Sequence, residues 1–545
     1  MIRPGRAWQF AALTIAALVL LPLVALAVEA LRGDASLWPH LLRHVLPPTL
    51  VDTALLLLGV GMMVIVIGTG CAWLVSAYDF RGRAWLDGAL LLPLAVPTYI
   101  VAYTYMDLMH PIGPVPTALR ALLGIDDPRG LSLPAVRSLG GCVLVLGLVL
   151  YPYVYLTTRA MFLMQSASLI EAARTLGATP RSMFLRVALP LARPAVAVGA
   201  SLALMETIND IGASEFLGVR TLTISIYSTW ANRADLAGAA QIALAMLAIV
   251  AALLWLERAG RRRQRYSTGA QRARPMTPQR LRGWRAAGAF VLCAVPVLLG
   301  FGAPLAYLVD QSIERIRFAG LPPALLEATL NTVTMAAIAT AVILVLGVVV
   351  AYAVRVAPGA LSRGLERSAS LGYAVPGTVL AIGLLIPVGL VDGWLADRLE
   401  SVLGISAGLV LLGSGAALIY AYSARFLAVS VGGLESGFAR IAPSLDHAAR
   451  TLGQSRIGVL RRVHLPLIRP ALAAAALLVF VDCMKELPAT LLLRPLGFET
   501  LATTLYGEAA RGTYEDGAIA ALIIVLVGLI PVVLLARIGR TEAAT

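Results

Sequence analysis

Long apolar runs recur along the whole chain, and they constrain its fold more than any other feature. Each run has about 20 residues, which is enough for one helix to cross a hydrocarbon layer of roughly 30 Å. Of the 545 residues, 59% are hydrophobic and 14% are charged, whereas a soluble domain has about 25% charged residues. The sequence therefore predicts an all-α integral membrane protein with about twelve transmembrane helices. The expected spans are 8–30, 50–77, 86–107, 138–160, 192–212, 236–256, 286–309, 329–354, 368–391, 406–430, 470–490 and 517–537.

The net charge of +14 comes almost entirely from arginine, because Lys485 is the only lysine. The arginines gather in short segments between apolar runs, a pattern typical of membrane proteins rather than of nucleic-acid binding. Since basic segments stay in the cytoplasm, both termini are expected on that side. The most basic segment, 257–285, is also rich in Ser, Thr, Gly and Pro. It predicts a linker between a first domain at 1–256 and a second at 286–545.

A polar segment is repeated in the two halves. Residues 171–195 and 447–471 align without a gap at an offset of 276, and 14 of the 25 positions are identical. Internal repeats of this kind are common in transporters. An even number of expected spans separates the copies, so both should face the same side of the membrane. The halves are thus expected to form two parallel six-helix repeats.

Each copy is expected to fold as a helix, a glycine turn and a second short helix. Ser168 and Glu171 have the spacing of a capping box, and Gly177 suits the left-handed position that ends a helix. Thr179 and Pro180 then predict an N-cap and first helical position, and Leu189-Pro190 should stop the second helix. The other copy has equivalent residues, namely Ser444, Gly453, Ser455 and Leu465-Pro466.

These repeated segments are candidates for contact with a partner on one membrane face. Ala172-Ala173 and Ala448-Ala449 have small side chains that allow close approach, and Arg174 and Arg450 place charge beside them. Near-identity at two related positions favours a symmetric partner. The alternative is a pair of amphipathic helices that face lipid.

Two acidic pairs follow the repeated segments at the same offset. One pair is Glu206 and Asp210, and the other is Asp482 and Glu486. The two acids of each pair are four residues apart and so lie on one helix face. At the offset of 276, Glu206 corresponds to Asp482 and Asp210 to Glu486. Carboxylates at this depth are costly unless they face a cavity or have partners. One interpretation is a pathway that passes or gates a cationic or chelated metal substrate. The other is structural: the helices break at Gly212 and Pro488, and the acids cap the next segment or pair with Lys485.

No motif for catalysis or a resident metal stands out. The five histidines lack ligand spacing, and no nucleophile motif is evident. A P-loop needs Gly-Lys-Ser/Thr, but Lys485 follows Met484. Any ATP-driven step should therefore use a separate subunit. An ion-coupled secondary transporter, with the acids as a proton relay, is the alternative from another class.

The repeated segments resemble the signature of permeases in bacterial binding-protein-dependent ABC importers. The pattern is Glu-Ala-Ala, three residues, Gly, then Leu-Pro, and the second copy departs from it by having His447 in place of Glu. The resemblance identifies these segments as ATPase-coupling loops. Their residues are Glu171, Ala172, Ala173, Arg174, Gly177, Leu189, Pro190, His447, Ala448, Ala449, Arg450, Gly453, Leu465 and Pro466.

The fused two-half arrangement further resembles the ferric-iron transport permeases. Supporting stretches lie at 93–99, 205–210, 373–378 and 482–490. The resemblance implies a non-enzymatic permease in the bacterial inner membrane, with two copies of an ABC ATPase subunit and a periplasmic substrate-binding protein as partners. ATP and magnesium would be bound by the ATPase, with no cofactor on this chain. Thiamine, polyamines or another small solute are the alternative substrates.

Overall fold

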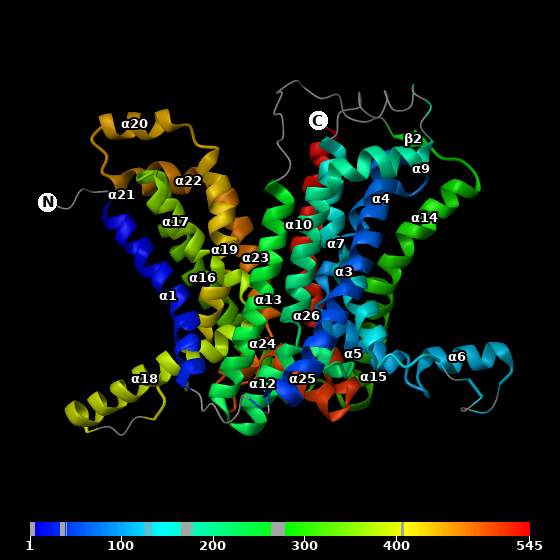
Figure 1. The fold of residues 1–545 in the computed structure, drawn as a ribbon, viewed down its shortest axis with the longest axis horizontal. Coiled ribbons are helices and arrows are strands. Elements are labelled where there is room, and N and C mark those ends of the chain that lie inside the picture. The colour runs from blue at the N-terminus through cyan, green and yellow to red at the C-terminus, as the bar shows by residue number, and fades with distance from the viewer. Residues whose placement is uncertain are drawn as a thin grey trace. The chain divides into compact units, whose positions relative to one another are not determined.

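Helices make up almost the whole of the computed structural model (Figure 1). The structure describes residues 6–32, 39, 41–125, 127, 130–131, 133–164, 175, 177, 179–262, 278–404 and 408–544. Their contacts divide the chain into two compact units. Unit 1 is built from 1–39, 226–245 and 323–504, and unit 2 from 40–225, 246–322 and 505–545.

Unit 1 combines the N-terminal helix with helices from the second half of the sequence. Helix α1 packs against α16, α17 and α18. The bounds are α1 (Arg6–Arg32), α16 (Pro323–Val356), α17 (Ala360–Ala369), η5 (Leu371–Ala374), α18 (Gly377–Leu403), α19 (Ala416–Ala439), α20 (Pro443–Thr451), α21 (Arg456–Val459), η6 (Leu460–His464), α22 (Leu465–Leu467), α23 (Arg469–Met484) and α24 (Pro488–Leu493).

Unit 2 makes the reciprocal exchange, because α14 and α15 pack on helices of the first half. Its two short strands pair in parallel, with Tyr78 opposite Gln279. The bounds are η1 (Leu41–Val45), α3 (Leu46–Ala77), β1 (Tyr78–Asp79), α4 (Arg83–Ala89), η2 (Leu92–Ala95), α5 (Thr98–Leu108), α6 (Pro114–Leu123), α7 (Leu139–Met164), α9 (Pro180–Met183), η3 (Phe184–Ala188), α10 (Leu189–Asn209), α11 (Gly212–Phe216), β2 (Gln279–Arg280), α14 (Trp284–Val297), η4 (Leu298–Gly302), α15 (Ala303–Ala319) and α26 (Tyr514–Ala544).

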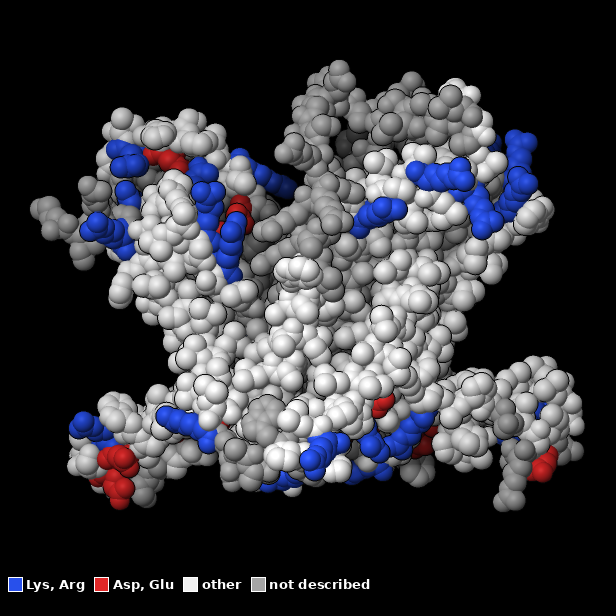
Figure 2. Space-filling model, viewed as in Figure 1, with Lys and Arg blue, Asp and Glu red and all other residues white. Residues whose placement is uncertain are grey.

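Three helices are divided between the units: α12 (Leu222–Arg233), α13 (Leu236–Arg262) and α25 (Leu501–Arg511). Among the described residues, ten helices are long and apolar enough to span a membrane, or twelve if two bent pairs each count as one span. Each of the twelve expected spans overlaps one of these, which confirms the all-helical membrane fold. On the face shown in Figure 2, each unit has charged residues toward its ends and a nearly uncharged band between them.

The same close helix contact occurs in both units. A Cβ on Gly68 of α3 would lie 2.8 Å from the carbonyl oxygen of Tyr151 in α7. In unit 1, a Cβ on Gly347 of α16 would overlap the hydroxyl of Ser430 in α19. A side chain would strike the backbone of α7 at Gly68 and the Ser430 side chain at Gly347, so glycine lets each helix pair approach closely, as is common between membrane helices.

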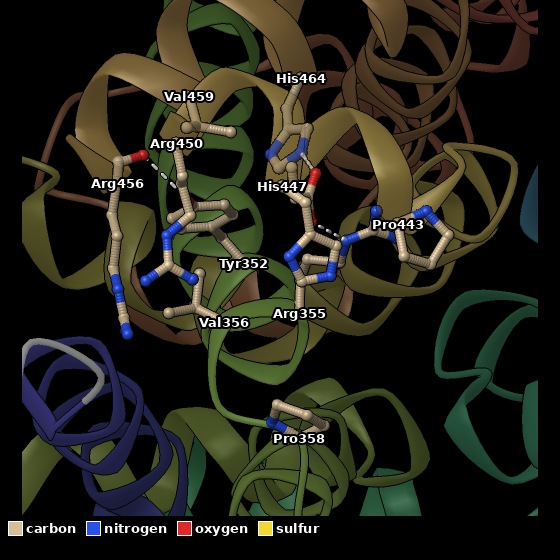
Figure 3. Close-up of a pocket in the computed structure, with 11 residues that line it drawn as sticks. Tyr352, Arg355, Val356, Pro358, Pro443, His447, Arg450, Arg456, Val459 and His464 are labelled. Atoms are coloured by element: carbon tan, nitrogen blue, oxygen red, sulfur yellow. Dashed lines mark hydrogen bonds and ion pairs between the residues drawn. The ribbon is translucent and has the colours of Figure 1, made fainter. Parts of the chain in front are cut away.

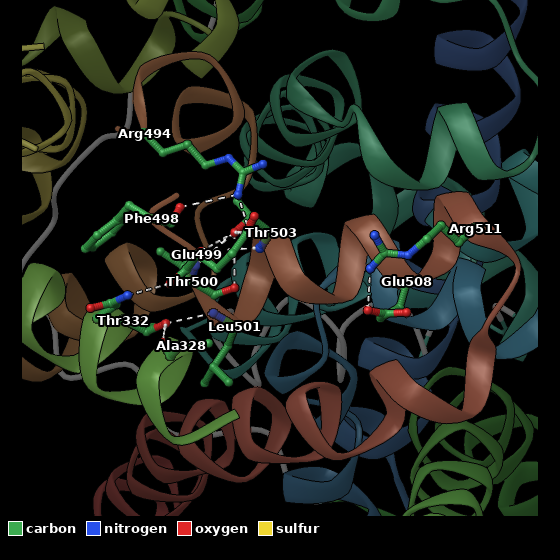
Figure 4. A network of polar contacts seen from close by, with 11 residues as sticks. Ala328, Thr332, Arg494, Phe498, Glu499, Thr500, Leu501, Thr503, Glu508 and Arg511 are labelled. Carbon is green, nitrogen blue, oxygen red and sulfur yellow. Dashed lines mark hydrogen bonds and ion pairs between the residues drawn. The ribbon is translucent and has the colours of Figure 1, made fainter. Parts of the chain in front are cut away.

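A threonine cap is likewise repeated. The Thr53 hydroxyl of α3 accepts a hydrogen bond from the backbone N–H of Leu222, at 3.2 Å. In unit 1, the Thr332 hydroxyl of α16 accepts one from Leu501, at 2.8 Å (Figure 4). Each bond satisfies a free N–H at the start of a short helix, α12 or α25. The repeat seen in the sequence is therefore also a repeat of contacts.

Candidate functional site

The first of the two repeated polar segments is described only in part. Glu171, Ala172, Ala173 and Arg174 lie outside the described residues, so their expected helix is not addressed. Gly177 has φ +78°, the left-handed conformation expected for a helix-ending glycine. The Thr179 hydroxyl accepts a hydrogen bond from the Ser182 N–H at 3.3 Å, which confirms the predicted N-cap of α9.

The second repeated segment is described in full. Helix α20 begins at Pro443 with Ala442 as its N-cap, so the prediction of Ser444 as the cap is wrong, because proline already supplies the fixed φ of the first helical position. The helix ends as expected. Gly453 has φ +79°, and the Gln454 N–H bonds back to the carbonyl of Ala449.

The prediction that Leu189-Pro190 and Leu465-Pro466 stop a helix is wrong. A π-turn precedes each pair, in which the N–H of Leu189 bonds to the carbonyl of Phe184 and that of Leu465 to the carbonyl of Leu460. The wider turn accommodates the proline, which lacks an N–H and would clash in a regular α-helix. The first helix therefore continues into α10, whereas the second continues to Leu467 before a 76° bend.

Helix α20 presents a small apolar face to its surroundings. The side chains of Leu445 and Leu452 are 43% and 81% exposed, and Ala448 between them is also exposed. Leu445 and Ala448, spaced i and i+3, share one face of α20, and Leu452 follows the helix directly. Ala449 points inward and is buried. Only one of the two alanines of this copy is therefore available to a partner.

The opposite face of α20 is fixed by an ionic cluster (Figure 3). The Asp446 carboxylate accepts a hydrogen bond from Arg355 Nε at 2.9 Å and contacts His464 Nε2 at 2.6 Å. Arg355, at the end of α16, also donates to the carbonyls of Phe438 and Ile441 at the end of α19. We call Arg355, Asp446 and His464 the latch, because they tie α20 to two long helices and to η6.

The latch has an electrostatic consequence at Asp446. Burial alone would raise the pKa of this carboxyl group, but hydrogen bonds and charge from Arg355 and His464 outweigh it and hold the pKa below its usual value. At the offset of 276, Asp446 and His464 correspond to Ile170 and Ala188. The first copy therefore has no ionisable residues at these two positions.

Asp210 caps the short helix that follows it. Its carboxylate accepts hydrogen bonds from the Ser214 N–H at 2.9 Å and from the Thr98 hydroxyl. Helix α10 ends at Asn209 and α11 begins at Gly212. The helix break before Gly212 and the capping by Asp210 agree with the structural interpretation of the acidic pairs.

Glu486 has the same role in unit 1 with a different partner. It accepts hydrogen bonds from the N–H groups of Ala489 and Thr490, both at 3.1 Å, at the start of α24. Where Asp210 is bonded by Thr98, Glu486 pairs with the buried Arg425, 3.6 Å away. Gly377 leaves the room for this arginine, since a Cβ there would lie 2.5 Å from its Nη1.

The other two acids have different surroundings. Asp482 forms an ion pair with Lys485 at 2.9 Å, the partner named in the structural interpretation. Glu206 is half-buried, and no described residue forms a hydrogen bond or ion pair with it. Sequence reasoning missed Thr98, Arg425 and the latch partners Arg355 and His464. Arg425 could have been found from the sequence, because a basic residue within an apolar run indicates a buried polar partner.

The described residues contain no group of three or more His, Cys, Asp or Glu that could hold a metal ion. The site is thus a pair of polar segments followed by capped helix breaks in a multi-pass bundle, which defines the class as a membrane transport permease. Its family model, the binding-protein-dependent transport system inner membrane component, matches residues 64–266 and 343–540. The chain belongs to this family of ABC importer permeases and is a multi-pass inner-membrane protein.

Two relatives differ in the substrate their names give. The Fe(3+)-transport system permease protein FbpB 2 of Haemophilus influenzae is 25% identical over 500 residues, 91% of each chain. The molybdenum transport system permease protein ModB of Escherichia coli is 31% identical over 203 residues, 35% of this chain and 85% of its own. The first relative has the length of this chain, whereas the second is similar to only one part of it.

Proposed function

We propose that this chain is the permease of an ATP-driven importer of ferric iron. The observation that carries the iron proposal is the similarity over 91% of its length to a permease named for Fe(3+) transport. ATP hydrolysis would take place on two separate ATPase subunits, and a periplasmic binding protein would deliver the substrate. The family description, which names a binding-protein-dependent system, supports this division of labour.

The two repeated segments would be the ATPase-coupling loops. In unit 1, the exposed surface formed by Leu445, Ala448 and Leu452 would dock on the ATPase, while the latch would transmit its movement to α16 and α19. A force applied to α20 reaches these helices only if α20 moves as a rigid element. The hydrogen bonds of Asp446 and Arg355 supply that rigidity.

Both coupling loops would face the cytoplasm together with the chain termini. In unit 1, the first turns of α1 and helix α20 lie at the same end (Figure 1), and the rings of Trp8 and Tyr352 pack edge to face with 4.8 Å between their centroids. In unit 2, α9 and the last turns of α26 lie at the same end (Figure 1). These placements support the orientation that the distribution of arginines predicts.

The substrate proposal is tested by uptake into proteoliposomes that contain the chain, its ATPase and its binding protein. Ionophores collapse all ion gradients, and radioactive Fe(III), molybdate and thiamine are offered separately. We expect uptake of iron that depends on ATP. Uptake of molybdate or thiamine alone would overturn the iron assignment, and uptake that persists without ATP but stops with the ionophores would overturn the ATP-driven mechanism.

A further inference from the structure

A cavity of about 380 Å³ lies beneath α20 in unit 1 (Figure 3). It is bordered by α20, by the end of α16 and the residues after it, and by α21 with η6. The ionisable groups around it are strongly unbalanced, with five basic side chains and one acidic one. They are Arg355, His447, Arg450, Arg456, His464 and Asp446.

The single acid is already occupied by the latch. Asp446 uses one oxygen for Arg355 and the other for His464. Neither Arg450 nor Arg456 forms an ion pair with any described residue. Figure 3 shows both side chains on the same side of Tyr352, so two guanidinium groups border one cavity without a carboxylate between them.

Arg456 also brings to this cavity a hydrogen-bond donor that lacks a protein acceptor. Arg456 Nη1 is buried and has no hydrogen-bond partner among the described residues. Buried polar groups are normally satisfied, and an unsatisfied donor indicates a missing acceptor. Tyr352 shapes the cavity wall, and its hydroxyl is committed to the carbonyl of Arg456 at 2.7 Å.

We propose that this cavity binds a phosphate group, held chiefly by Arg450 and Arg456. Two guanidinium groups present planar pairs of donors that match phosphate oxygens, and a phosphate supplies the missing negative charge and acceptors. The volume is sufficient for a free phosphate ion or for the headgroup of an anionic phospholipid. Because Arg450 belongs to α20 and Arg456 to α21, an occupied cavity would stiffen the link between these two helices. The inference does not depend on which substrate is transported.

The test uses the full-length chain in nanodiscs of phosphatidylcholine. Its unfolding temperature is measured while sodium phosphate replaces sodium chloride at constant ionic strength. A ligand that binds only the folded state raises this temperature once its concentration exceeds Kd, and the rise then grows with the logarithm of the concentration. The lipid source is tested by replacing a third of the phosphatidylcholine with phosphatidylglycerol in discs without added phosphate.

The variant R450Q/R456Q is compared with R461Q/R462Q, which loses the same charge from two exposed arginines that do not border the cavity. We expect the same rise with phosphate concentration for the wild-type chain and the control, and at least a tenfold higher apparent Kd, fitted from this dependence, for the cavity variant. R456K keeps the positive charge but loses the planar guanidinium group, so its apparent Kd for phosphate should lie between those of the wild-type chain and the double variant. As a single conservative substitution, it also controls for misfolding of the double variant. A rise with phosphate identifies the free ion, and a rise with phosphatidylglycerol alone identifies the headgroup. No rise in either arm, or equal rises in both double variants, would overturn the proposal.

Discussion

At the residue scale, corresponding acids in the two units have the same capping role but different hydrogen-bond and ion-pair partners. Asp210 and Glu486 both cap a helix that begins a few residues later. A hydroxyl from Thr98 completes one cap, and a guanidinium from Arg425 completes the other. A buried carboxylate is stable only when its oxygens are bonded, so the capping role explains why acids occur at this depth.

Glu206 and Asp482, which pairs with Lys485, are the two acids that do not cap a helix. We predict that E206Q/D482N lowers ATP-dependent iron uptake at least about tenfold, because removal of carboxylates weakens contacts with a hard cation. The rate of uptake into proteoliposomes measures the effect. The matched control is D397N/E400Q, which removes two exposed acids of α18. Unchanged uptake in E206Q/D482N would end the pathway interpretation.

Another pair of corresponding positions predicts a pH dependence. In unit 2, Asp87 forms a two-point salt bridge with Arg159, with Nη2 2.6 Å from Oδ2. Aligned on Val96-Pro97 and Val375-Pro376, Asp87 corresponds to Glu366, and at the offset of 276 Arg159 corresponds to Glu435. In unit 1 two acids therefore lie against each other at the edge of a cavity of about 320 Å³ that Arg363 and Arg367 also border.

Burial, a hydrogen bond with Glu435 and its charge raise the pKa of Glu366 to about 7, although Arg367 opposes the shift. A carboxyl whose pKa is raised on folding stabilises the protein below its unfolded pKa of 4.5, and this stability is lost as the pH rises through about 7. We predict that E366Q raises the unfolding temperature at pH 8 more than at pH 5. Thermal unfolding at both values is the measurement, with E400Q as the exposed control. An equal change at both pH values would contradict the prediction.

At the element scale, the latch makes α20 part of the helix bundle. We predict that D446N weakens binding of the ATPase subunit, because Arg355 and His464 lose the carboxylate that joins them. Loss of a charged hydrogen-bond partner costs about 1–3 kcal/mol, equivalent to an affinity change of about 5–150-fold. Affinity is measured by titrating the purified ATPase onto the chain in nanodiscs.

The control for this substitution is D397N, which makes the same chemical change at an exposed position in α18. The unfolding temperature of D446N separates a local change in α20 from general instability. If D446N binds the ATPase as tightly as D397N does, the latch does not position α20 and its role in coupling is refuted.

The sequence predicts most elements because two strong signals coincide in them. Apolar runs locate the spans, and Gly177 and Gly453 mark turns where only a left-handed residue fits. The same reasoning placed a helix end at Leu189-Pro190, since a proline normally breaks a helix, and it could not foresee the π-turn before it. It likewise could not find the latch, because Arg355 and His464 are 91 and 18 residues from Asp446 and meet it only through tertiary packing.

At the scale of the whole molecule, the compact units do not follow the halves of the sequence. Helix α1 packs with second-half helices in unit 1, and α14 and α15 pack with first-half helices in unit 2. The proposed domains, 1–256 and 286–545 with a linker between them, describe the sequence repeat. The first helices of each repeat therefore pack in the unit that is formed mainly by the other repeat.

This exchange predicts that neither half is stable alone. We expect fragments 1–262 and 278–545 to be degraded when expressed singly, because each lacks helices that complete one of its units. Expressed together, they should co-purify through the packing of α1 on α16, α17 and α18. Immunoblotting of membranes from each expression measures the amounts. Stable accumulation of either fragment alone would contradict this account of the packing.

The central claim is that α20 receives the ATPase. A photo-crosslinking amino acid at Leu452, the exposed residue that directly follows α20, tests it directly in membranes that contain both subunits. The control position is the exposed Leu496, which follows α24 near the other end of unit 1 (Figure 1). The account predicts a crosslinked product with the ATPase from position 452 and none from 496. A product from 496, or its absence from 452 in a complex that hydrolyses ATP, would contradict it.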